Sequence, residues 1–346
     1  MTKKASFRFY GDPQKHTPLI ELLPLNTPLS LHIDPSNVCN LRCKFCPTGH
    51  PDILRDVNRP HGFMDFSLFK KIIDDLTDFP KPLRNLHLYK DGEPLLNSNF
   101  SEMVKYAKNS DVAKTIETTT NALMLSPEIA QKLADSGLDR IRISIQHVSS
   151  EGYNSLTNTT IKFEDVIEKV RVLHSKVKKL GYGPLIHVKI LDSGLSEEEK
   201  KYFIKTFENI SDEIHIDALM GWNKSDLFDF RLGIRPPSGM NPSSLVTPRN
   251  VCPLPFYSLA INIDGTVSAC CVDWSHSVIV GDLNSQSLLD IWNSDRLRTF
   301  RLGQLTNRTQ TNPVCAFCDY VNGLPQTSNL DMAIERLQTV FSEGGV

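Results

Sequence analysis

The sequence predicts an α/β fold built on a parallel sheet. Short apolar strands alternate with amphipathic helices six times between residues 30 and 220, which indicates right-handed strand–helix–strand crossovers. The chain has 346 residues, 40% of them hydrophobic and 23% charged, as expected for a globular protein of one or two domains. Sheets of this kind place their chemistry at the carboxyl ends of the strands.

The elements follow in chain order. Strands are predicted over residues 30–34, 84–89, 114–120, 139–146, 184–191 and 213–217. Helices are predicted over 64–79, 99–109, 126–137, 163–180 and 196–209, the first with Asp65 as its N-cap. Beyond residue 250 the pattern predicts a hairpin that turns at Asp264–Gly265, then a helix near 286–301, a Cys-bearing loop and a C-terminal helix from about 328.

Charge and hydropathy exclude several classes of protein. The net charge of −2 offers no broad electrostatic surface for nucleic acid. No apolar run approaches the roughly 18 residues of a membrane span, and the N-terminus lacks the apolar core of a signal peptide. We therefore expect a cytoplasmic chain that binds neither nucleic acid nor membrane. In that reducing compartment the eight cysteines favour metal or catalytic roles over disulfides.

Three of the cysteines follow the first predicted strand with C-x3-C-x2-C spacing: Cys39, Cys43 and Cys46. Three thiolates on one loop can hold three irons of a cubane and leave the fourth iron open to a small chelating molecule. The alternative is structural zinc, which needs four ligands and would require His50 as the fourth.

This spacing, with the aromatic Phe45 before the last Cys, resembles the signature of the radical S-adenosylmethionine (SAM) superfamily. The six repeats are similar to that family's partial (β/α)6 TIM-like barrel. The resemblance implies that SAM binds the open iron, and that one electron from the [4Fe–4S] cluster cleaves SAM to a 5′-deoxyadenosyl radical. That radical would abstract a hydrogen atom from the substrate, so the chain is expected to be a radical SAM oxidoreductase.

Further SAM contacts are implied by the same resemblance. Gly92-Glu93-Pro94 is similar to the family's GGEP turn, although Asp91 stands where the first Gly is usual. Other expected cofactor contacts lie late in the strands or beside the cluster loop, namely Phe45, Thr120, Asn121, Ser144 and Lys189. Each has a structural alternative: a simple turn, a hydrogen bond that caps a strand, an aromatic that only covers the cluster, or a snorkelling lysine.

The second cysteine group resembles a SPASM domain in its shortened "twitch" form, which holds one auxiliary [4Fe–4S] cluster. The implied ligands are Cys252, Cys270, Cys315 and Cys318. Their terminal C-x2-C is also a zinc pattern. The Gly-x4-Cys spacing from Gly265 selects Cys270 over Cys271, which leaves Cys271 as a neighbour. The resulting division is an N-terminal extension over 1–29, a radical SAM core over 30–220, a linker or substrate loop over 221–250, and the SPASM/twitch domain with a C-terminal helix over 251–346.

Two clusters suit a reaction in which a substrate radical loses an electron. The architecture resembles 2-deoxy-scyllo-inosamine dehydrogenase and the anaerobic sulfatase-maturating enzymes. The first prediction is therefore oxidation of a small alcohol, a sugar or cyclitol, with the auxiliary cluster as acceptor and a low-potential donor such as flavodoxin or ferredoxin. The alternatives are modification of a peptide or protein, epimerisation with a thiol such as Cys271 as hydrogen donor, and a non-enzymatic iron–sulfur or zinc scaffold.

Oxidation also needs a base near the abstracted carbon. The candidates lie at strand ends: His147, Asp91 and Lys90 first, with His87 and Asp217 beside them. Each of them could instead be a structural hydrogen-bonding residue. Trp222 and Arg235 are candidate substrate contacts in the linker.

Overall fold

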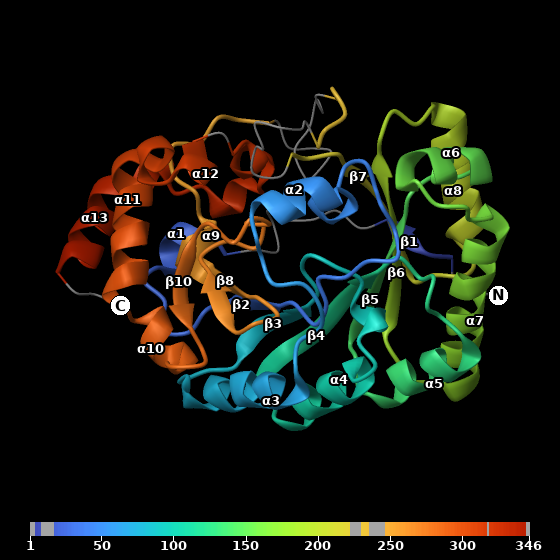
Figure 1. The fold of residues 1–346 in the computed structure, drawn as a ribbon, viewed down its shortest axis with the longest axis horizontal. Coiled ribbons are helices and arrows are strands. Elements are labelled where there is room, and N and C mark those ends of the chain that lie inside the picture. Colours follow the sequence, from blue (N-terminus) through green and yellow to red (C-terminus); the bar gives the residue numbers. More distant parts are fainter. Residues whose placement is uncertain (1–3, 8–16, 222–229, 235–245, 317, 344–346) are drawn as a thin grey trace.

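The computed structural model describes residues 4–7, 17–221, 230–234, 246–316 and 318–343. Trp222 and Arg235 lie outside the described residues. The strands form one ten-stranded sheet in the order β1-β7-β6-β5-β4-β3-β2-β8-β9-β10 (Figure 1). None of the helices in the described part of the chain is long and apolar enough to cross a membrane.

The middle of the sheet confirms the predicted α/β fold. Six strands pair in parallel, each with the next in sequence: β2 (Ser30–Ile33), β3 (Leu83–Leu88), β4 (Ala113–Thr120), β5 (Arg140–Ile145), β6 (Leu185–Asp192) and β7 (Glu213–Ala218). The crossover helices are α3 (Phe66–Asp75), α4 (Phe100–Asn109), α5 (Pro127–Asp135), α7 (Phe163–Leu180) and α8 (Glu197–Phe207). They cover the outer face of the curved sheet (Figure 1).

Local signals explain where these helices begin. The side chain of Asp65 accepts a hydrogen bond from the Ser67 N–H at the start of α3, as predicted. Ser126 caps α5 in the same way, through the Ile129 N–H. Ser196 and Glu199 form a complete capping box on α8. Each cap satisfies N–H groups that the first turn leaves without partners.

The six strands are apolar on the outer face and polar on the inner face. In β5, Ile141 and Ile143 are fully buried in the main core, which they share with the crossover helices. The alternate residues Arg140 and Arg142 belong to the other face, because successive side chains of a strand point to opposite sides. The barrel therefore encloses a polar interior, in contrast to parallel sheets buried on both faces by apolar side chains.

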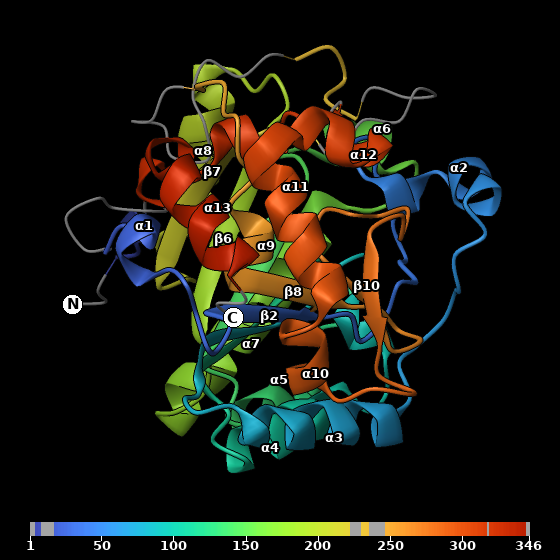
Figure 2. The ribbon, with the colours of Figure 1, turned by 90° about the vertical axis from the view of Figure 1, so that its left-hand side faces the viewer.

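The chain beyond residue 250 continues the same sheet. Strand β8 (Ser258–Ile261) pairs in parallel with β2, with Ser30 opposite Ser258. The predicted hairpin is confirmed: β8 and β9 (Thr266–Ser268) are antiparallel, and Gly265 has a φ of 88° in the turn. Strand β10 (Ile279–Asp282) completes the edge. In Figure 2 the C-terminal helices α11 (Asp295–Thr311) and α13 (Ile334–Ser342) lie in front of β8 and β2.

The prediction of a single helix near 286–301 is wrong. The segment forms two helices, α10 (Leu288–Trp292) and α11, because Ser294 breaks the run and caps α11 by accepting from the Leu297 N–H. The predicted C-terminal helix also begins later than expected, since α13 is preceded by short 3-10 turns. Short helices α9 (Leu254–Tyr257) and α12 (Pro313–Ala316) flank the second cysteine group.

Besides β10, four further short elements in the described residues were not predicted. They are β1 (Ser6–Phe7), α1 (Leu19–Leu22), α2 (Pro51–Asp56) and α6 (Ser150–Thr157). Strand β1 pairs with β7, and Leu19 of α1 packs in a second core with Leu337 and Phe341 of α13. The predicted N-terminal extension thus contacts both β7 of the barrel and the C-terminal helix α13.

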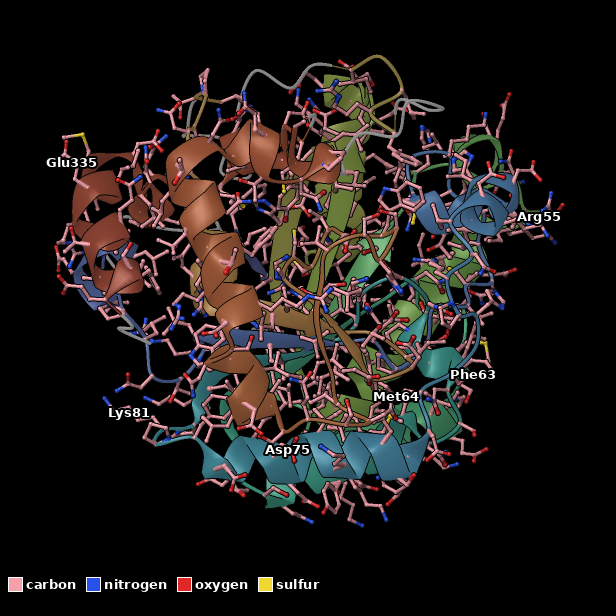
Figure 3. All side chains as sticks on the ribbon, turned by 60° about the vertical axis from the view of Figure 1, so that its left-hand side comes forward. Arg55, Phe63, Met64, Asp75, Lys81 and Glu335 are labelled. Atoms are coloured by element: carbon pink, nitrogen blue, oxygen red, sulfur yellow. The ribbon has the colours of Figure 1, made fainter. Side chains whose placement is uncertain are left out.

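The C-terminal helices dock on the barrel through α3. The Asp75 carboxylate accepts from the Leu288 N–H at 3.0 Å, so it holds the start of α10 against the end of α3. Figure 3 shows Asp75 on α3 where the two helices meet. In the same view Met64 is buried beside the barrel, whereas Arg55 and Phe63 point outward.

Candidate active site

The first cysteine loop follows β2 and is largely buried. Cys43 is buried and packs with Leu41 and Leu219, and the other two cysteines pack against the same cluster. Burial raises the pKa of Cys39 to about 12 and raises the pKa of the Cys43 and Cys46 thiols. Thiols in such a place bind as thiolates only beside compensating positive charge, which an iron cluster supplies. The residues present therefore fit the implied cluster.

The turn after β3 lies directly against the chain that enters this loop. The Glu93 N–H donates to the Val38 carbonyl at 2.8 Å. A Cβ at Gly92 would stand 2.2 Å from the Ser36 carbonyl oxygen and 2.5 Å from that of Val38. Both contacts are with backbone, so no larger residue fits without moving the loop. Gly92 is required for this close approach.

The Glu93 carboxylate links this turn to the end of β4. It accepts hydrogen bonds from the Thr120 hydroxyl at 2.6 Å and the Asn121 N–H at 2.7 Å. The Asn121 amide in turn donates to the Asn40 side chain at 2.7 Å, inside the cysteine loop. Burial raises the pKa of Glu93 to about 7. A buried carboxylate at this position is suited to a cationic group such as the ammonium of SAM.

A cavity of about 330 Å³ lies at the carboxyl ends of the strands, and Gly92, Glu93, Thr120 and Asn121 are not among the residues that line it. Phe45 and Cys46 of the first cysteine loop line one part of it, and Cys271 and Tyr320 of the C-terminal region line another. The barrel contributes His32, Tyr89, Lys90, Arg142, Lys189 and Asp217. The structure therefore brings together both cysteine groups and the polar interior of the barrel.

Most charges in the cavity wall are paired. Lys189 contacts Asp217 at 2.7 Å, and His215 contacts the other Asp217 oxygen at 3.0 Å. Burial alone would raise the pKa of Asp217, but Lys189 and His215 outweigh it and hold that pKa well below its usual range. Arg142 donates to Glu117 at 2.5 Å. The predicted cofactor residue Ser144 lies on β5, opposite Lys189 of the neighbouring strand β6.

His32 is a cavity residue that the sequence analysis missed. Its Nδ1 is buried and makes no hydrogen bond to any residue in the described part of the chain. Burial and the neighbouring His87 ring, 4.3 Å away, lower its pKa well below 6.5, so the ring is neutral. The available signal was its position: His32 alternates with Leu31 and Ile33, which face the core.

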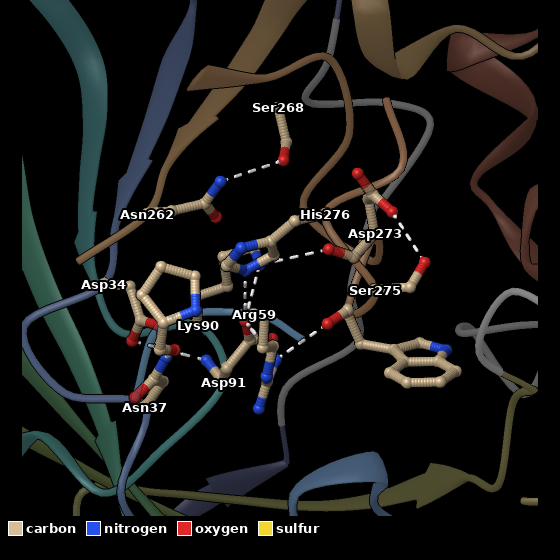
Figure 4. Close-up of polar contacts among 12 residues, drawn as sticks. Asp34, Asn37, Arg59, Lys90, Asp91, Asn262, Ser268, Asp273, Ser275 and His276 are labelled. Carbon is tan, nitrogen blue, oxygen red and sulfur yellow. Dashed lines mark hydrogen bonds and ion pairs between the residues drawn. The ribbon is translucent and has the colours of Figure 1, made fainter. Parts of the chain in front are cut away.

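Two predicted bases lie in a buried ion cluster (Figure 4). One Asp91 oxygen contacts Arg59 at 2.9 Å, Lys90 at 2.6 Å and His276 at 3.3 Å. Asp91 does not line the cavity, unlike Lys90. Burial alone would raise the pKa of Asp91, but Lys90 and Arg59 outweigh it and hold that pKa well below its usual range. Arg59 and Lys90 also donate to the carbonyls of Trp274 and Asp273, at 2.8 and 3.3 Å, which joins the barrel to the C-terminal region.

The predicted base His147 contacts residues at the start of α6 and in α8. Its Nδ1 accepts from the Ser149 N–H at 3.2 Å, and its Nε2 lies 3.5 Å from Glu199. The ring covers Gly152 in the first turn of α6, where a Cβ would stand 2.1 Å from Nδ1. His147 does not line the cavity described above.

The second cysteine group surrounds a small separate cavity. Its walls include four thiols, from Cys252, Cys270, Cys315 and Cys318, whereas Cys271 lines the larger cavity. Burial raises the pKa of Cys315 to about 12 and that of Cys318 to about 11. The four thiols thus line one common space. This donor set fits the implied auxiliary cluster.

Polar groups close to this thiol set come from α11. The Arg308 guanidinium donates to the carbonyls of Cys315 and Cys318 at 2.8 and 3.2 Å. The Gln304 amide lies 3.7 Å from the Cys315 sulfur. Such donors orient cluster ligands and offset their negative charge. Val272 and Tyr320 line both cavities, so the two sites share a wall.

Comparisons with known proteins agree with this geometry. Residues 33–208, just over half of the chain, match the model of the radical SAM superfamily, and residues 252–319 match the SPASM iron–sulfur cluster-binding domain. Relatives include the tungsten-containing aldehyde ferredoxin oxidoreductase cofactor-modifying protein of Pyrococcus furiosus (30% identity; 46% of this chain, 43% of the relative). Another is GTP 3′,8-cyclase of Staphylococcus haemolyticus (25% identity; 58% and 56%). The chain spans about half the length of these curated relatives.

Solved structures with the same fold cover most of the chain. SuiB of Streptococcus suis bound to S-adenosylmethionine matches with a TM-score of 0.63 (15% identity; 88% of this chain, 76% of SuiB). Native anSMEcpe with bound AdoMet matches with a TM-score of 0.59 (14% identity; 91% and 100%). BtrN in complex with AdoMet and 2-DOIA matches with a TM-score of 0.50 (19% identity; 83% and 91%). The chain therefore belongs to the radical SAM superfamily and is an enzyme with a SPASM domain, whose cofactors are SAM and [4Fe–4S] clusters.

Proposed function

We propose that the enzyme oxidises a small alcohol, a sugar or cyclitol, by two electrons. SAM and a cluster on Cys39, Cys43 and Cys46 supply the 5′-deoxyadenosyl radical, and the auxiliary cluster is the electron acceptor. One observation carries the proposal: the cavity bounded by Cys46 shares Val272 and Tyr320 with the thiol-lined cavity of the C-terminal region. A substrate radical in this cavity lies beside an electron acceptor.

The protein's own residues in this step bind and orient the substrate. A volume of about 330 Å³ falls within the range of small-molecule sites, and the wall offers ionised groups that bind hydroxyls. Lys189 and Asp217 hold each other in place, and Tyr89 accepts a hydrogen bond from Arg142 at 3.1 Å. These paired groups are rigid, which favours a single substrate orientation.

We further propose His32 as the proton acceptor. Oxidation of an alcohol radical requires loss of the hydroxyl proton, and the acceptor needs an open lone pair within reach of the cavity. The oxygens of Asp217 are held by Lys189 and His215, and the Lys90 ammonium is held by Asp91. The ring of His32 is neutral, and its Nδ1 has no hydrogen-bond partner in the described part of the chain.

Anaerobic reconstitution tests the proposal. We expect about eight irons per chain and formation of 5′-deoxyadenosine from SAM under reductant. With a panel of sugars and cyclitols, a product lighter by two hydrogens should form in a ratio of one to 5′-deoxyadenosine. Peptides form a parallel panel, because a modified peptide would identify the alternative substrate class. About four irons with no SAM cleavage would refute the proposal.

Two variants separate the steps. Cys315→Ser should still form 5′-deoxyadenosine but should lose the oxidised product, because the electron acceptor is disrupted. His32→Gln should retain SAM cleavage and lower the rate of product formation about 100-fold, the usual scale of general-base catalysis, with partial recovery at higher pH. Unchanged product formation by His32→Gln would remove it as the acceptor.

A further inference from the structure

The wall of the larger cavity carries more positive than negative groups. Three basic side chains line it, each from a different part of the barrel: Lys90 follows β3, Arg142 lies on β5 and Lys189 lies on β6. Among the described residues that line this cavity, Asp217 of β7 is the single carboxylate. A cleft lined mainly by one sign of charge attracts ligands of the opposite sign.

The carboxylates that pair with two of these cations lie outside the cavity wall. Asp91 contacts Lys90 at 2.6 Å and Glu117 contacts Arg142 at 2.5 Å, yet neither carboxylate lines the cavity. Each pair therefore anchors its cation from outside the wall, and the basic member is the one that borders the cavity. A ligand in the cavity meets the cations without meeting these two carboxylates.

The negative charge beside Lys90 is also too small to balance the cations there. One oxygen of Asp91 contacts both Lys90 and Arg59, whose side chains are buried, so one carboxylate serves two cations. Asp34 is the neighbouring carboxyl, but burial raises its pKa to about 8, so it is mainly protonated at neutral pH and adds little negative charge. Solvent screens buried charges poorly, so the positive excess acts on the cavity.

Arg142 and Lys189 are placed to contact the same ligand. Lys189 stands opposite Ser144 in the pairing of β5 with β6, and Arg142 lies two residues before Ser144, on the same face of the sheet. The side chains of Arg142 and Lys189 are 15% and 21% exposed, whereas that of Lys90 is fully buried. The planar guanidinium of Arg142 matches the oxygens of a carboxylate or phosphate, and the Lys189 ammonium has three donors, one of which bonds to Asp217.

We propose that the substrate carries an anionic group, a carboxylate or a phosphate, which Arg142 and Lys189 bind directly. This substrate class, sugar acids or sugar phosphates, rests on the proposed function, because it assigns the occupant of the same cavity. The cofactors do not use up the excess positive charge. An oxidised [4Fe–4S] cluster on three thiolates carries one negative charge and SAM carries one positive charge, so the two together are neutral.

Calorimetric titration of the cluster-loaded enzyme, with SAM present and no reductant, tests this preference without turnover. The probes are glucose, glucuronate and glucose 6-phosphate, which share one ring and differ in charge. At equal ionic strength, at least one anionic probe should bind roughly tenfold or more tightly than glucose, because hydrogen bonds to charged groups are stronger than those between neutral groups. The comparison of glucuronate with glucose 6-phosphate distinguishes a carboxylate from a phosphate.

Two variants of Arg142 and a distant control assign the preference to the cavity. Arg142→Gln should weaken binding of the preferred anionic probe about tenfold and leave glucose within about twofold. Glu117 keeps its contact with His87 at 2.6 Å, so it is not left buried without a partner. Arg142→Lys should restore most of the preference, since it keeps the charge. Arg171→Gln removes the same charge from the exposed side of α7 and should leave the preference intact.

The outcomes keep this substrate class apart from the proposed function. If glucose binds as tightly as both anionic probes, or if neither anionic probe binds, the class is wrong while oxidation of a neutral alcohol still stands. A preference that Arg142→Gln leaves unchanged, or that Arg171→Gln removes equally, would also overturn it. A preference for anions in an enzyme that cleaves no SAM would support the role of Arg142 and refute the proposed function.

Discussion

Asp91 is the anion on which two buried cations depend. The side chains of Asp91, Arg59 and Lys90 are 2%, 2% and 0% exposed, so solvent offsets none of their charges. His276, in the loop after Cys271, contacts the same carboxylate through its Nε2. Its backbone has a φ of 53°, in the left-handed region. In the resembling GGEP turn a glycine is usual at the position of Asp91. This enzyme thus replaces a flexible residue with the centre of an ion cluster.

We predict that Asp91→Asn destabilises the protein by about 3–5 kcal/mol, because it leaves two buried cations uncompensated. The midpoint of urea unfolding of the cluster-loaded protein measures this change. The control is Arg171→Gln, which breaks an ion pair whose side chains are 53% and 59% exposed. That change should stay within about 0.5 kcal/mol. Equal effects of the two substitutions would contradict the role of Asp91 as the counter-charge of Arg59 and Lys90.

Asp34 gives the same cluster a pH dependence. Burial, and then the neighbouring Asp91, raise its pKa from 3.8 to about 8. Between these values the folded chain keeps a proton that the unfolded chain releases, so stability falls as the pH rises, by up to about 1.4 kcal/mol per pH unit. In Asp34→Asn the midpoint temperature of thermal unfolding should therefore depend less on pH between about pH 5.5 and 8.5. The exposed Asp56→Asn should leave the wild-type slope in place, and a wild-type midpoint that rises with pH would contradict the prediction.

The sequence predicted the residues of this site that belong to local motifs. The spacing of the cysteine loop and the resemblance of Gly92-Glu93 to a family motif indicated both segments, and the structure brings them together. Arg59, His32 and His276 could not be found in that way, because their partners lie far away in sequence. His276 meets Asp91 only because β8 is the neighbour of β2, a pairing that no local pattern encodes.

At the scale of elements, the turn after β3 is the most constrained. Its fit against the Ser36–Val38 backbone leaves no room for a side chain at Gly92. The strands and crossover helices were predictable because their periodicity is local. The break between α10 and α11 was not, because Ser294 reads as an ordinary helix residue unless its hydrogen bond to the Leu297 N–H is known. The two-residue strand β1 carries too little pattern to be found.

We predict that Gly92→Ala weakens SAM binding roughly tenfold or more, because the turn that carries Glu93 must shift. The change that SAM causes in the electron paramagnetic resonance spectrum of the reduced cluster measures this binding. The matched control is Gly181→Ala at the C-cap of α7, where a Cβ meets nothing within 4 Å but φ is 75°. It should cost about 1 kcal/mol of stability and leave SAM binding intact. Equal SAM affinity in both variants would contradict the prediction.

At the scale of the whole molecule, the predicted boundary at residue 251 runs through a continuous sheet. Strand β8 lies beyond it, yet its register with β2 covers every residue of β2. The α3–α10 contact and the Asp91 cluster cross the same boundary. The radical SAM region and the SPASM region are therefore built as one structure, although two family models describe them.

We predict that a chain ending at residue 250 does not fold into a working barrel. Its β2 would become an exposed edge that carries Leu31 and Ile33, and the buried Lys90 and Arg59 would lose their contacts with the C-terminal region. Soluble yield and iron content after reconstitution measure the outcome, with the full chain as control. A soluble truncated chain that binds about four irons and cleaves SAM would refute this interdependence.

The pairing of β8 with β2 also bears on the order in which the chain is made and the cluster is inserted. The ribosome makes the first cysteine loop about 210 residues before β8, the strand that completes its side of the sheet. During that interval three thiols meant for an oxygen-sensitive cluster remain beside an open edge. We therefore expect cluster insertion to follow the pairing of β8 with β2, and the three thiols to need a reducing environment until then.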